Sequence, residues 1–132
     1  MTDEIGPLVA VVNDDTAFLE LMEELLSDEG YRTVIHRESD TAYQAIRGAM
    51  PALVILDIRM EHPEGGWNVL ELLRLDPKTT GIPVIVCSAD AIQLRAKQEH
   101  LQRHRAVSIE KPFDLDELLE LVVSQIGEPR RE

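Results

Sequence analysis

Polar side chains with complementary chemistry follow the apolar runs of this chain. They are three carboxylates, an amide, a hydroxyl and an ammonium: Asp14, Asp15, Asp57, Asn13, Ser88 and Lys111. A strand that ends in an ionised group must open into a polar crevice, because an unpaired charge inside a sheet is strongly disfavoured. In open α/β sheets, ligands bind in the crevice at the carboxyl ends of the strands. We therefore expect these side chains to gather in one crevice around Asp57.

Such a crevice requires a cation. Two carboxylates about 4 Å apart carry like charges and repel by roughly 4 kcal/mol at an effective dielectric constant near 20. Oxygen ligands without His or Cys favour Mg²⁺, which keeps several water molecules that a phosphate can displace. Mg²⁺ and Lys111 would neutralise charge, Ser88 would donate a hydrogen bond and Asp57 would attack the phosphorus atom in line. These residues predict Mg²⁺-dependent phosphoryl transfer to Asp57.

The elements that must position these residues alternate between two periodicities. Five apolar runs predict buried strands: Leu8–Val12, Tyr31–His36, Leu53–Asp57, Ile82–Cys87 and Val107–Ile109. Helical spacing follows each run, at about 16–29, 40–50, 67–75, 91–105 and 114–126. This alternation specifies a parallel sheet with helices on both faces, because crossovers between parallel strands are right-handed. The predicted fold is a three-layer α/β domain.

Several helix ends carry recognisable signals. Gly30 stands where a left-handed C-cap is required, and Ser39 or Asp40 can cap the second helix. Asp114 with Glu117 three residues later predicts a capping box for the last helix.

The expected apolar faces follow from the same spacing. The first helix would bury Phe18, Leu21, Met22, Leu25 and Leu26. The second would bury Ala42, Ala45, Ile46 and Ala49, and the third Val69, Leu70 and Leu73. The segment 91–105 is mostly polar, with Ile92, Leu94 and Leu101 as its expected contacts.

Length and composition restrict the functional classes. At 132 residues the chain fits one domain, expected over residues 6–127 with tails at 1–5 and 128–132. The formal net charge of −12 argues against nucleic acid and against an anionic membrane surface as partners. The N-terminal residues lack the pattern of a signal peptide, so we expect a cytoplasmic protein. Cys87, the single cysteine, is expected to be a small core residue.

Four motifs give the chain from Val9 to Ile126 a resemblance to the receiver domains of two-component response regulators. They are Val-Val-Asn-Asp-Asp at 11–15, Leu-Asp-Ile-Arg-Met at 56–60, Ile-Pro-Val-Ile-Val-Cys-Ser-Ala at 82–89 and Glu-Lys-Pro-Phe at 110–113. Each motif alone is weak, but four in this order and spacing are specific. The resemblance implies a doubly wound, flavodoxin-like (CheY-like) sheet with strand order 2-1-3-4-5 and a cis bond between Lys111 and Pro112.

The resemblance also implies individual roles. Asp57 would be the phosphoacceptor, while Ser88 and Lys111 would hold the phosphoryl group. Asp14 would bind Mg²⁺ directly, with Asp57 and the backbone carbonyl of Arg59 as further ligands.

Three residues near this site leave alternatives open. Asp15 is equally consistent with a member of the metal site and with the cap of the first helix. Arg59 and Asp90 form either a surface ion pair or a pair that tunes dephosphorylation by controlling water access.

The chain departs from the family pattern at three places. Asn13 replaces the first residue of the usual acidic pair, which binds the metal through water, so Asn13 should weaken Mg²⁺ affinity. The loop 61–66 is about one residue longer than usual, and no proline follows Met60 directly. Ser108 occupies the position of the family's aromatic switch residue. The phosphorylation signal would therefore have to leave the site by another route.

The leading hypothesis is a stand-alone receiver that takes a phosphoryl group from a phosphohistidine of a histidine kinase or a histidine phosphotransfer protein. It would catalyse its own phosphorylation and slow hydrolysis, without turnover of an external substrate, and so would not be an enzyme in the usual sense. Output would pass by protein contact or phosphorelay through the face of the fourth and fifth helices and the fifth strand. The expected oligomeric state is a monomer or weak dimer.

Other functions are weaker alternatives. A receiver-like binding module that signals without phosphate is favoured by Asn13 and Ser108. A phosphatase of the haloacid dehalogenase type would place a second aspartate two residues after Asp57, where this chain has Arg59. His100 and His104 lie four residues apart on a helix, but without a third ligand in reach by sequence they indicate a solvated face. Trp67 is expected to be a packing residue.

Overall fold

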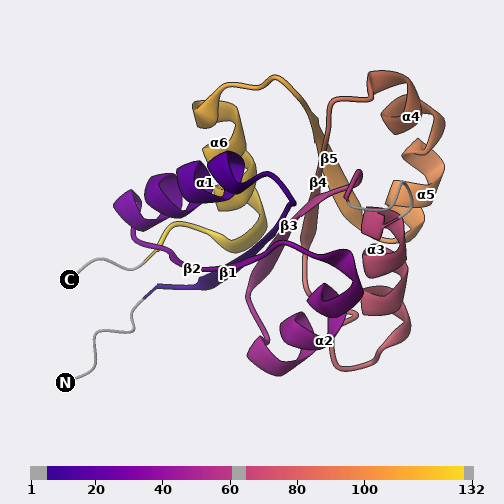
Figure 1. The fold of residues 1–132 in the computed structure, drawn as a ribbon, viewed down its shortest axis with the longest axis horizontal. Coiled ribbons are helices and arrows are strands. Elements are labelled where there is room, and N and C mark those ends of the chain that lie inside the picture. The colour runs from indigo at the N-terminus through magenta and orange to yellow at the C-terminus, as the bar shows by residue number, and fades with distance from the viewer. Residues whose placement is uncertain (1–5, 61–64, 130–132) are drawn as a thin grey trace.

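The computed structural model describes residues 6–60 and 65–129 and shows a five-stranded, fully parallel sheet between two helical layers (Figure 1). The strands, in the order β2-β1-β3-β4-β5, are β1 (Leu8–Val12), β2 (Arg32–His36), β3 (Leu53–Asp57), β4 (Val84–Ser88) and β5 (Ala106–Glu110). The predicted fold class and strand order are confirmed. The predicted insertion in the loop falls mainly on residues 61–64, outside the described residues.

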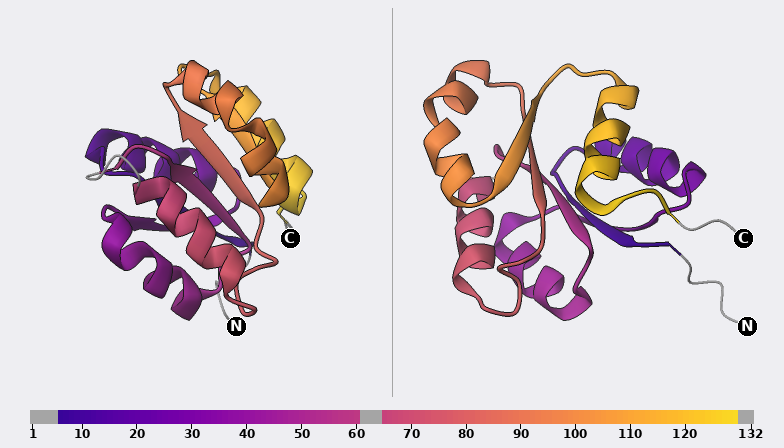
Figure 2. Two further views of the ribbon diagram at one scale, coloured as in Figure 1. Left: turned by 90° about the vertical axis from the view of Figure 1, so that its right-hand side faces the viewer. Right: turned by 180° about the vertical axis from the view of Figure 1, so that it is seen from behind.

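The helices cover both faces of the sheet (Figure 2). They are α1 (Thr16–Asp28), α2 (Ser39–Ala49), α3 (Gly65–Leu75), α4 (Ala91–Ala96), α5 (Gln98–Arg103) and α6 (Leu115–Ile126). One core joins the sheet to α1 and α6, and the other joins it to α2, α3 and the α4–α5 segment. Along β3, Leu53 and Ile55 enter the first core, whereas Val54 and Leu56 enter the second. Both faces of β3 and β4 are therefore buried, as the unbroken apolar runs predict.

Two of the three predicted helix ends are confirmed. Gly30 adopts φ +98°, and the N–H of Tyr31 donates to the carbonyl of Leu26, which gives α1 a Schellman-type end. The N–H of Asp114 donates to Glu117 Oε1 at 3.0 Å, as a capping box requires.

The predicted cap of α2 by Ser39 or Asp40 is wrong. Glu38 occupies the N-cap position, and both predicted residues lie inside the first helical turn. Ser39 is buried against the start of α3, where a Cβ atom added to Gly65 would lie only 2.7 Å from its Oγ. Local sequence does not encode this packing between α2 and α3.

Helix faces follow the prediction closely for α3 and less closely elsewhere. The centre of the buried face of α1 is Leu19, Met22 and Leu26, whereas Leu21 is 43% exposed. In α2 only Ala42 and Ile46 of the predicted apolar residues are buried. These helices each bury a narrower stripe than their apolar residues could cover.

The segment 91–105 is not one helix as predicted, because Lys97 has φ −103° and ψ 15°, outside the helical region. Leu94 and Leu101 are buried, as expected. The prediction for Ile92 is wrong: this side chain is 77% exposed and lines the cavity beside Asp57. None of the described helices is both long enough and apolar enough to cross a bilayer.

A polar cluster ties α2 to the turn after α3. Asp76 Oδ2 accepts hydrogen bonds from the Tyr43 hydroxyl at 2.6 Å and from Arg47 Nε at 2.7 Å. Asp76 Oδ1 accepts from the N–H of Lys78 at 2.9 Å. The Tyr43 hydroxyl, with the other donors, lowers the pKa of Asp76 from 3.8 to about 2. The ionised carboxylate therefore stabilises the fold above pH 3.8, and this contribution is lost as the pH falls toward 2.

We expect Asp76→Asn to lower the Tm at neutral pH by roughly 2–6 °C, because it weakens three hydrogen bonds to a charged acceptor. The difference from the parent protein should shrink as the pH falls from about 4 to about 2. Thermal unfolding followed by circular dichroism across this range checks the prediction. Glu24→Gln on the exposed face of α1 is the control for loss of one negative charge, and an equal effect of both variants would contradict the role of the cluster.

Candidate functional site

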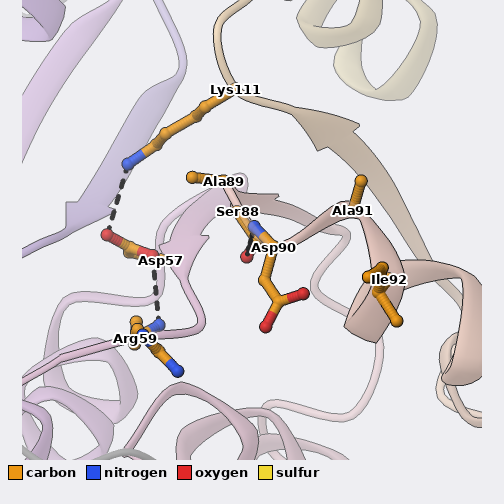
Figure 3. Close-up of a pocket in the computed structure, with 8 residues that line it drawn as sticks. All are labelled: Asp57, Arg59, Ser88, Ala89, Asp90, Ala91, Ile92 and Lys111. Atoms are coloured by element: carbon orange, nitrogen blue, oxygen red, sulfur yellow. Dashed lines mark hydrogen bonds and ion pairs between the residues drawn. The ribbon is translucent and has the colours of Figure 1, made fainter.

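Asp57 and Lys111 meet at the carboxyl end of the sheet. Asp57 is the last residue of β3, and Lys111 directly follows β5, two strands away. Lys111 Nζ lies 3.3 Å from Asp57 Oδ2, and the N–H of Arg59 donates to Asp57 Oδ1 at 3.1 Å (Figure 3). Both oxygens of the carboxylate therefore have a partner. The parallel topology brings these two residues together across 54 positions of sequence.

An open cavity of about 560 Å³ adjoins this pair. Its lining is contributed by the ends of β3 and β4, the start of α4 and the residue after β5 (Figure 3): Asp57, Arg59, Ser88, Ala89, Asp90, Ala91, Ile92 and Lys111. Ser88 is 3% exposed, and its Oγ accepts a hydrogen bond from the N–H of Asp90 at 3.0 Å. This bond leaves the hydroxyl proton of Ser88 available to another acceptor. A carboxylate, an ammonium and a hydroxyl thus share one cavity.

Burial dominates the electrostatics of Asp57. The side chain is largely removed from water, and this desolvation raises its pKa above the usual 3.8. The charge of Lys111 and the N–H of Arg59 oppose the shift in pKa, whereas the nearby charge of Asp14 adds to it. Lys111 therefore compensates only part of the cost of ionising Asp57. The site favours an additional positive charge close to this carboxylate.

The three polar residues after β1 have different environments. Asn13 is 1% exposed, and its Oδ1 accepts from the N–H of Asp15 at 2.8 Å, while its Nδ2 has no partner among the described residues. Asp15 caps α1, because its Oδ1 accepts from the N–H of Ala17 at 3.0 Å and, less closely, from that of Phe18 at 3.4 Å. Asp14 is exposed, and its carboxylate accepts no hydrogen bond within the described ranges. Of the three, Asp14 is the most available to a ligand.

Two further contacts hold Lys111 in place. Its N–H donates to the carbonyl of Ser88 at 2.8 Å, which joins the end of β5 to the end of β4. Its ammonium lies 4.7 Å from the centre of the Phe18 ring on α1, a cation–π contact. The hydrogen bond and the cation–π contact direct the side chain toward Asp57. The peptide bond to Pro112 is cis, as the resemblance implies.

Arg59 and Asp90 both line the cavity, but no ion pair joins these two described residues. Asp90 instead caps α4, since its Oδ1 accepts from the N–H of Gln93 at 2.9 Å. Of the two alternatives for these residues, the surface ion pair is not formed, and a role in tuning dephosphorylation stays a prediction. Ser108 lies outside this cavity, half-buried in β5 opposite Val86 of β4.

Residues predicted to be structural are buried as expected. Cys87 is 1% exposed, and burial raises the pKa of its thiol to about 12, so the protonated form persists at neutral pH. Trp67 is 3% exposed and packs within the core.

The sequence pattern does not reveal a partner for His100 in α5 and His104, the residue directly after α5. Glu71 of α3 lies close to His100 and His104, and all three potential ligand atoms are within 4.8 Å of one another. Burial and the charge of His100 lower the pKa of His104. Only the packing of α3 against α5 brings Glu71 to this place.

Comparisons with known proteins agree on one family. The model of the response regulator receiver domain matches residues 9–123. NtrC of Bradyrhizobium sp. (strain RP501 Parasponia), a DNA-binding transcriptional regulator, is 30% identical over 123 residues, which cover 92% of this chain but 25% of NtrC. DivK of Brucella anthropi, a polar-differentiation response regulator, is 28% identical, and the match covers 91% of this chain and 96% of DivK. The chain thus spans about a quarter of the first relative and nearly all of the second.

Solved structures give the same fold. The receiver domain of the sensor histidine kinase PA1611 from Pseudomonas aeruginosa has a TM-score of 0.80 at 21% identity, over 93% of this chain and 99% of that domain. That structure has a magnesium ion coordinated in its active site cleft. The chemotaxis protein CheY4 of Vibrio cholerae has a TM-score of 0.81 at 18% identity, over 92% and 99% of the two chains. With the family match, these findings establish that the chain belongs to the response regulator receiver domains of two-component signalling.

Proposed function

We propose that Asp57 accepts a phosphoryl group from a phosphohistidine of a sensor histidine kinase or a histidine phosphotransfer protein. The contact between Lys111 Nζ and Asp57 Oδ2 beside an open cavity is the observation that supports this most directly. An oxygen of Asp57 attacks phosphorus as the bond between phosphorus and the histidine nitrogen breaks. The negative charge transferred to Asp57 is then neutralised in part by Lys111, and the Ser88 hydroxyl donates to a phosphoryl oxygen.

The residues around Asp57 fit a magnesium ion. Asp14, Asp57 and the backbone carbonyl of Arg59 provide oxygen ligands only, which is the donor set that Mg²⁺ prefers. The raised pKa of Asp57 indicates that its ionised form lacks sufficient positive charge in the described chain. When bound, Mg²⁺ would supply that charge and an oxygen site for the incoming phosphoryl group. Asn13 could contribute only through water, and Asp15 only with the oxygen that does not cap α1.

A small-molecule donor tests this proposal without the unknown kinase. Incubation with acetyl phosphate and Mg²⁺ should add the mass of one phosphoryl group to the intact protein. Reduction of the acyl phosphate with borohydride followed by peptide mass spectrometry should place the modification at Asp57. Absence of the mass gain at saturating Mg²⁺, or modification at another residue, would contradict the proposal. EDTA should prevent the gain if the metal is required.

We expect Ser88→Ala to slow this phosphorylation about tenfold to a hundredfold, since a hydrogen bond to a charged group contributes roughly 1.5–3 kcal/mol. Ser108→Ala removes the same hydroxyl from β5 outside the cavity, so its rate should match that of the parent protein. Rates of mass gain with acetyl phosphate check both variants. Equal rates for Ser88→Ala and Ser108→Ala would show that the Ser88 hydroxyl does not contact the transferred group.

A second candidate function is a binding module that works without phosphate. The hydrogen bond that engages Asn13 Oδ1 favours it, because the amide is then less available to support a metal. A Mg²⁺ titration of the free protein separates the two functions, since a binding module predicts no binding even at millimolar metal. A haloacid dehalogenase-type phosphatase is not proposed, because the chain is a receiver domain and has Arg59 in place of the second aspartate.

Output by protein contact or phosphorelay remains part of the proposal. The proposed surface for a downstream protein is the face formed by α4, α5, β5 and α6. The helices α4 and α5 occupy the segment of the predicted fourth helix, and α6 is the predicted fifth helix. It includes a groove beside Ser108 that carries the acidic side chains of Glu110, Glu117 and Glu120. A partner with basic residues would complement this charge.

A further inference from the structure

A second group of metal-ligating side chains lies between α3 and α5, outside the Asp57 cavity. His100 Nε2 is 3.7 Å from Glu71 Oε2, and the rings of His100 and His104 are 4.5 Å apart between centroids. All three ligand atoms lie within 4.8 Å of one another. We propose that Glu71, His100 and His104 bind a divalent transition-metal ion, with Zn²⁺ as the best fit. This site is independent of phosphoryl transfer.

The donor set distinguishes this site from the Asp57 cavity. Two imidazole nitrogens and one carboxylate oxygen suit Zn²⁺ and related borderline ions, whereas Mg²⁺ prefers oxygen ligands alone. Three protein ligands with the remaining position open to water form a common type of zinc site.

The distances allow closure with small movements. Ligands about 2.1 Å from a tetrahedral ion are separated by roughly 3.4 Å, so ligand atoms that lie within 4.8 Å of one another must approach by at most about 1.4 Å. The Glu71 side chain is 49% exposed, and rotation about its own bonds can bring its carboxylate closer to the two imidazole rings.

Helix α3 fixes the backbone that carries the histidines. The Trp67 ring makes an edge contact with the His100 ring, 5.3 Å between centroids. Arg74 donates through Nε to the carbonyl of His104 and through Nη1 to the carbonyl of Ile82 at 2.8 Å. Trp67, Glu71 and Arg74 recur at the spacing of one helix face, so the carboxylate lies between two anchors of α5. Figures 1 and 2 show α3 and α5 side by side.

A bound ion would join α5 to α3. The α4–α5 segment has few buried residues, Leu94 and Leu101, and its two helices have only six residues each. A ligand that binds only the folded state stabilises it by mass action. We therefore expect Zn²⁺ in excess to raise the Tm by roughly 5–10 °C.

The test is isothermal titration calorimetry of the untagged protein with ZnCl₂, in a buffer that contains millimolar Mg²⁺ to occupy the acidic cavity. The parent protein should bind one equivalent of Zn²⁺. Glu71→Gln and His104→Gln should each weaken the affinity about tenfold or more and abolish the Tm increase. Glu99→Gln removes the same charge from an exposed position of α5 and should bind Zn²⁺ as the parent does. Asp57→Asn should also leave Zn²⁺ affinity unchanged.

Two results would overturn the proposal. One is that Glu71→Gln and His104→Gln bind Zn²⁺ as tightly as the parent. The other is that Asp57→Asn loses the binding, which would assign the ion to the acidic cavity. Circular dichroism of each variant confirms that it is folded, and Glu71→Gln changes only an exposed side chain, so it keeps the test valid if His104→Gln unfolds.

Discussion

Asp57→Asn is expected to abolish the mass gain from acetyl phosphate completely. The amide keeps the size and shape of the carboxylate but loses the charge that makes the oxygen nucleophilic. It also removes the partner that holds Lys111 Nζ at 3.3 Å and one proposed ligand of Mg²⁺. Intact-protein mass spectrometry in the presence of saturating Mg²⁺ measures the loss.

Asp116→Asn is the matched control. This aspartate lies exposed in the first turn of α6, outside the cavity, so the variant should gain mass as the parent does. Retention of phosphorylation by Asp57→Asn would show that another carboxylate accepts the phosphoryl group. Asp14 would then be the first candidate, because its charge already influences the pKa of Asp57.

Asp57→Asn should be more stable than the parent protein, although it cannot be phosphorylated. Burial raises the pKa of Asp57 in the folded state, so the folded protein holds this proton more tightly than the unfolded chain. The contribution of protonated Asp57 to stability is present below the unfolded pKa near 3.8, and it is lost as the pH rises through the folded pKa. At neutral pH the ionised carboxylate therefore destabilises the fold, and Asn removes this cost.

We expect a gain of about 0.5–2 kcal/mol in the free energy of unfolding at pH 7 without metal, typical of substitutions at strained functional sites. Urea denaturation measures it. Mg²⁺ should reduce the difference by stabilising the parent more than the variant. A variant less stable than the parent at pH 7 without metal would show that the ion pair with Lys111 outweighs the desolvation of Asp57.

The pairing of Asp57 with Lys111 could be predicted because it depends on topology. Alternating apolar runs and helical segments specify a parallel sheet, and every residue that directly follows a strand lies at the same edge. Ser88 reaches the cavity for the same reason. No knowledge of side-chain packing is needed for these placements.

Features that depend on packing between distant elements could not be predicted. Ser39 packs against the beginning of α3 in place of capping α2. The exposure of Ile92 follows from its place beside the cavity. Glu71 meets His100 only because α3 and α5 pack together. Periodicity identifies helices, but it does not state which helix face meets which neighbour.

Local hydrogen bonds also restrict the roles that residue type leaves open. Asp15 was equally compatible with a metal site and a helix cap, and its contacts with Ala17 and Phe18 show that it caps α1. Asn13 fills a metal-site position in the family pattern, yet its oxygen is bound to the N–H of Asp15. Both assignments depend on side-chain rotamers, which a sequence pattern does not contain.

Gly66→Ala is expected to reduce the free energy of unfolding by about 3 kcal/mol, the upper end of the usual cost of overpacking. A Cβ atom at Gly66 would lie closer than 3.0 Å to the carbonyl of Asp57 and to the Cα and carbonyl of Ile58. These are backbone atoms, so they cannot move aside as a flexible side chain can. The N–H of Gly66 also donates to the carbonyl of Ile58 at 3.0 Å, so α3 begins directly against the residues that carry the site.

Gly48→Ala provides the matched comparison. Gly48 lies inside α2, and an added Cβ would meet no atom within 4 Å. Alanine should therefore raise the free energy of unfolding by about 0.4–1 kcal/mol, because it restricts the unfolded chain and favours the helix. Urea denaturation of both variants measures the contrast. A loss below about 1 kcal/mol for Gly66→Ala would mean that α3 can shift away from β3, and the close packing behind Asp57 would then not be required for the fold.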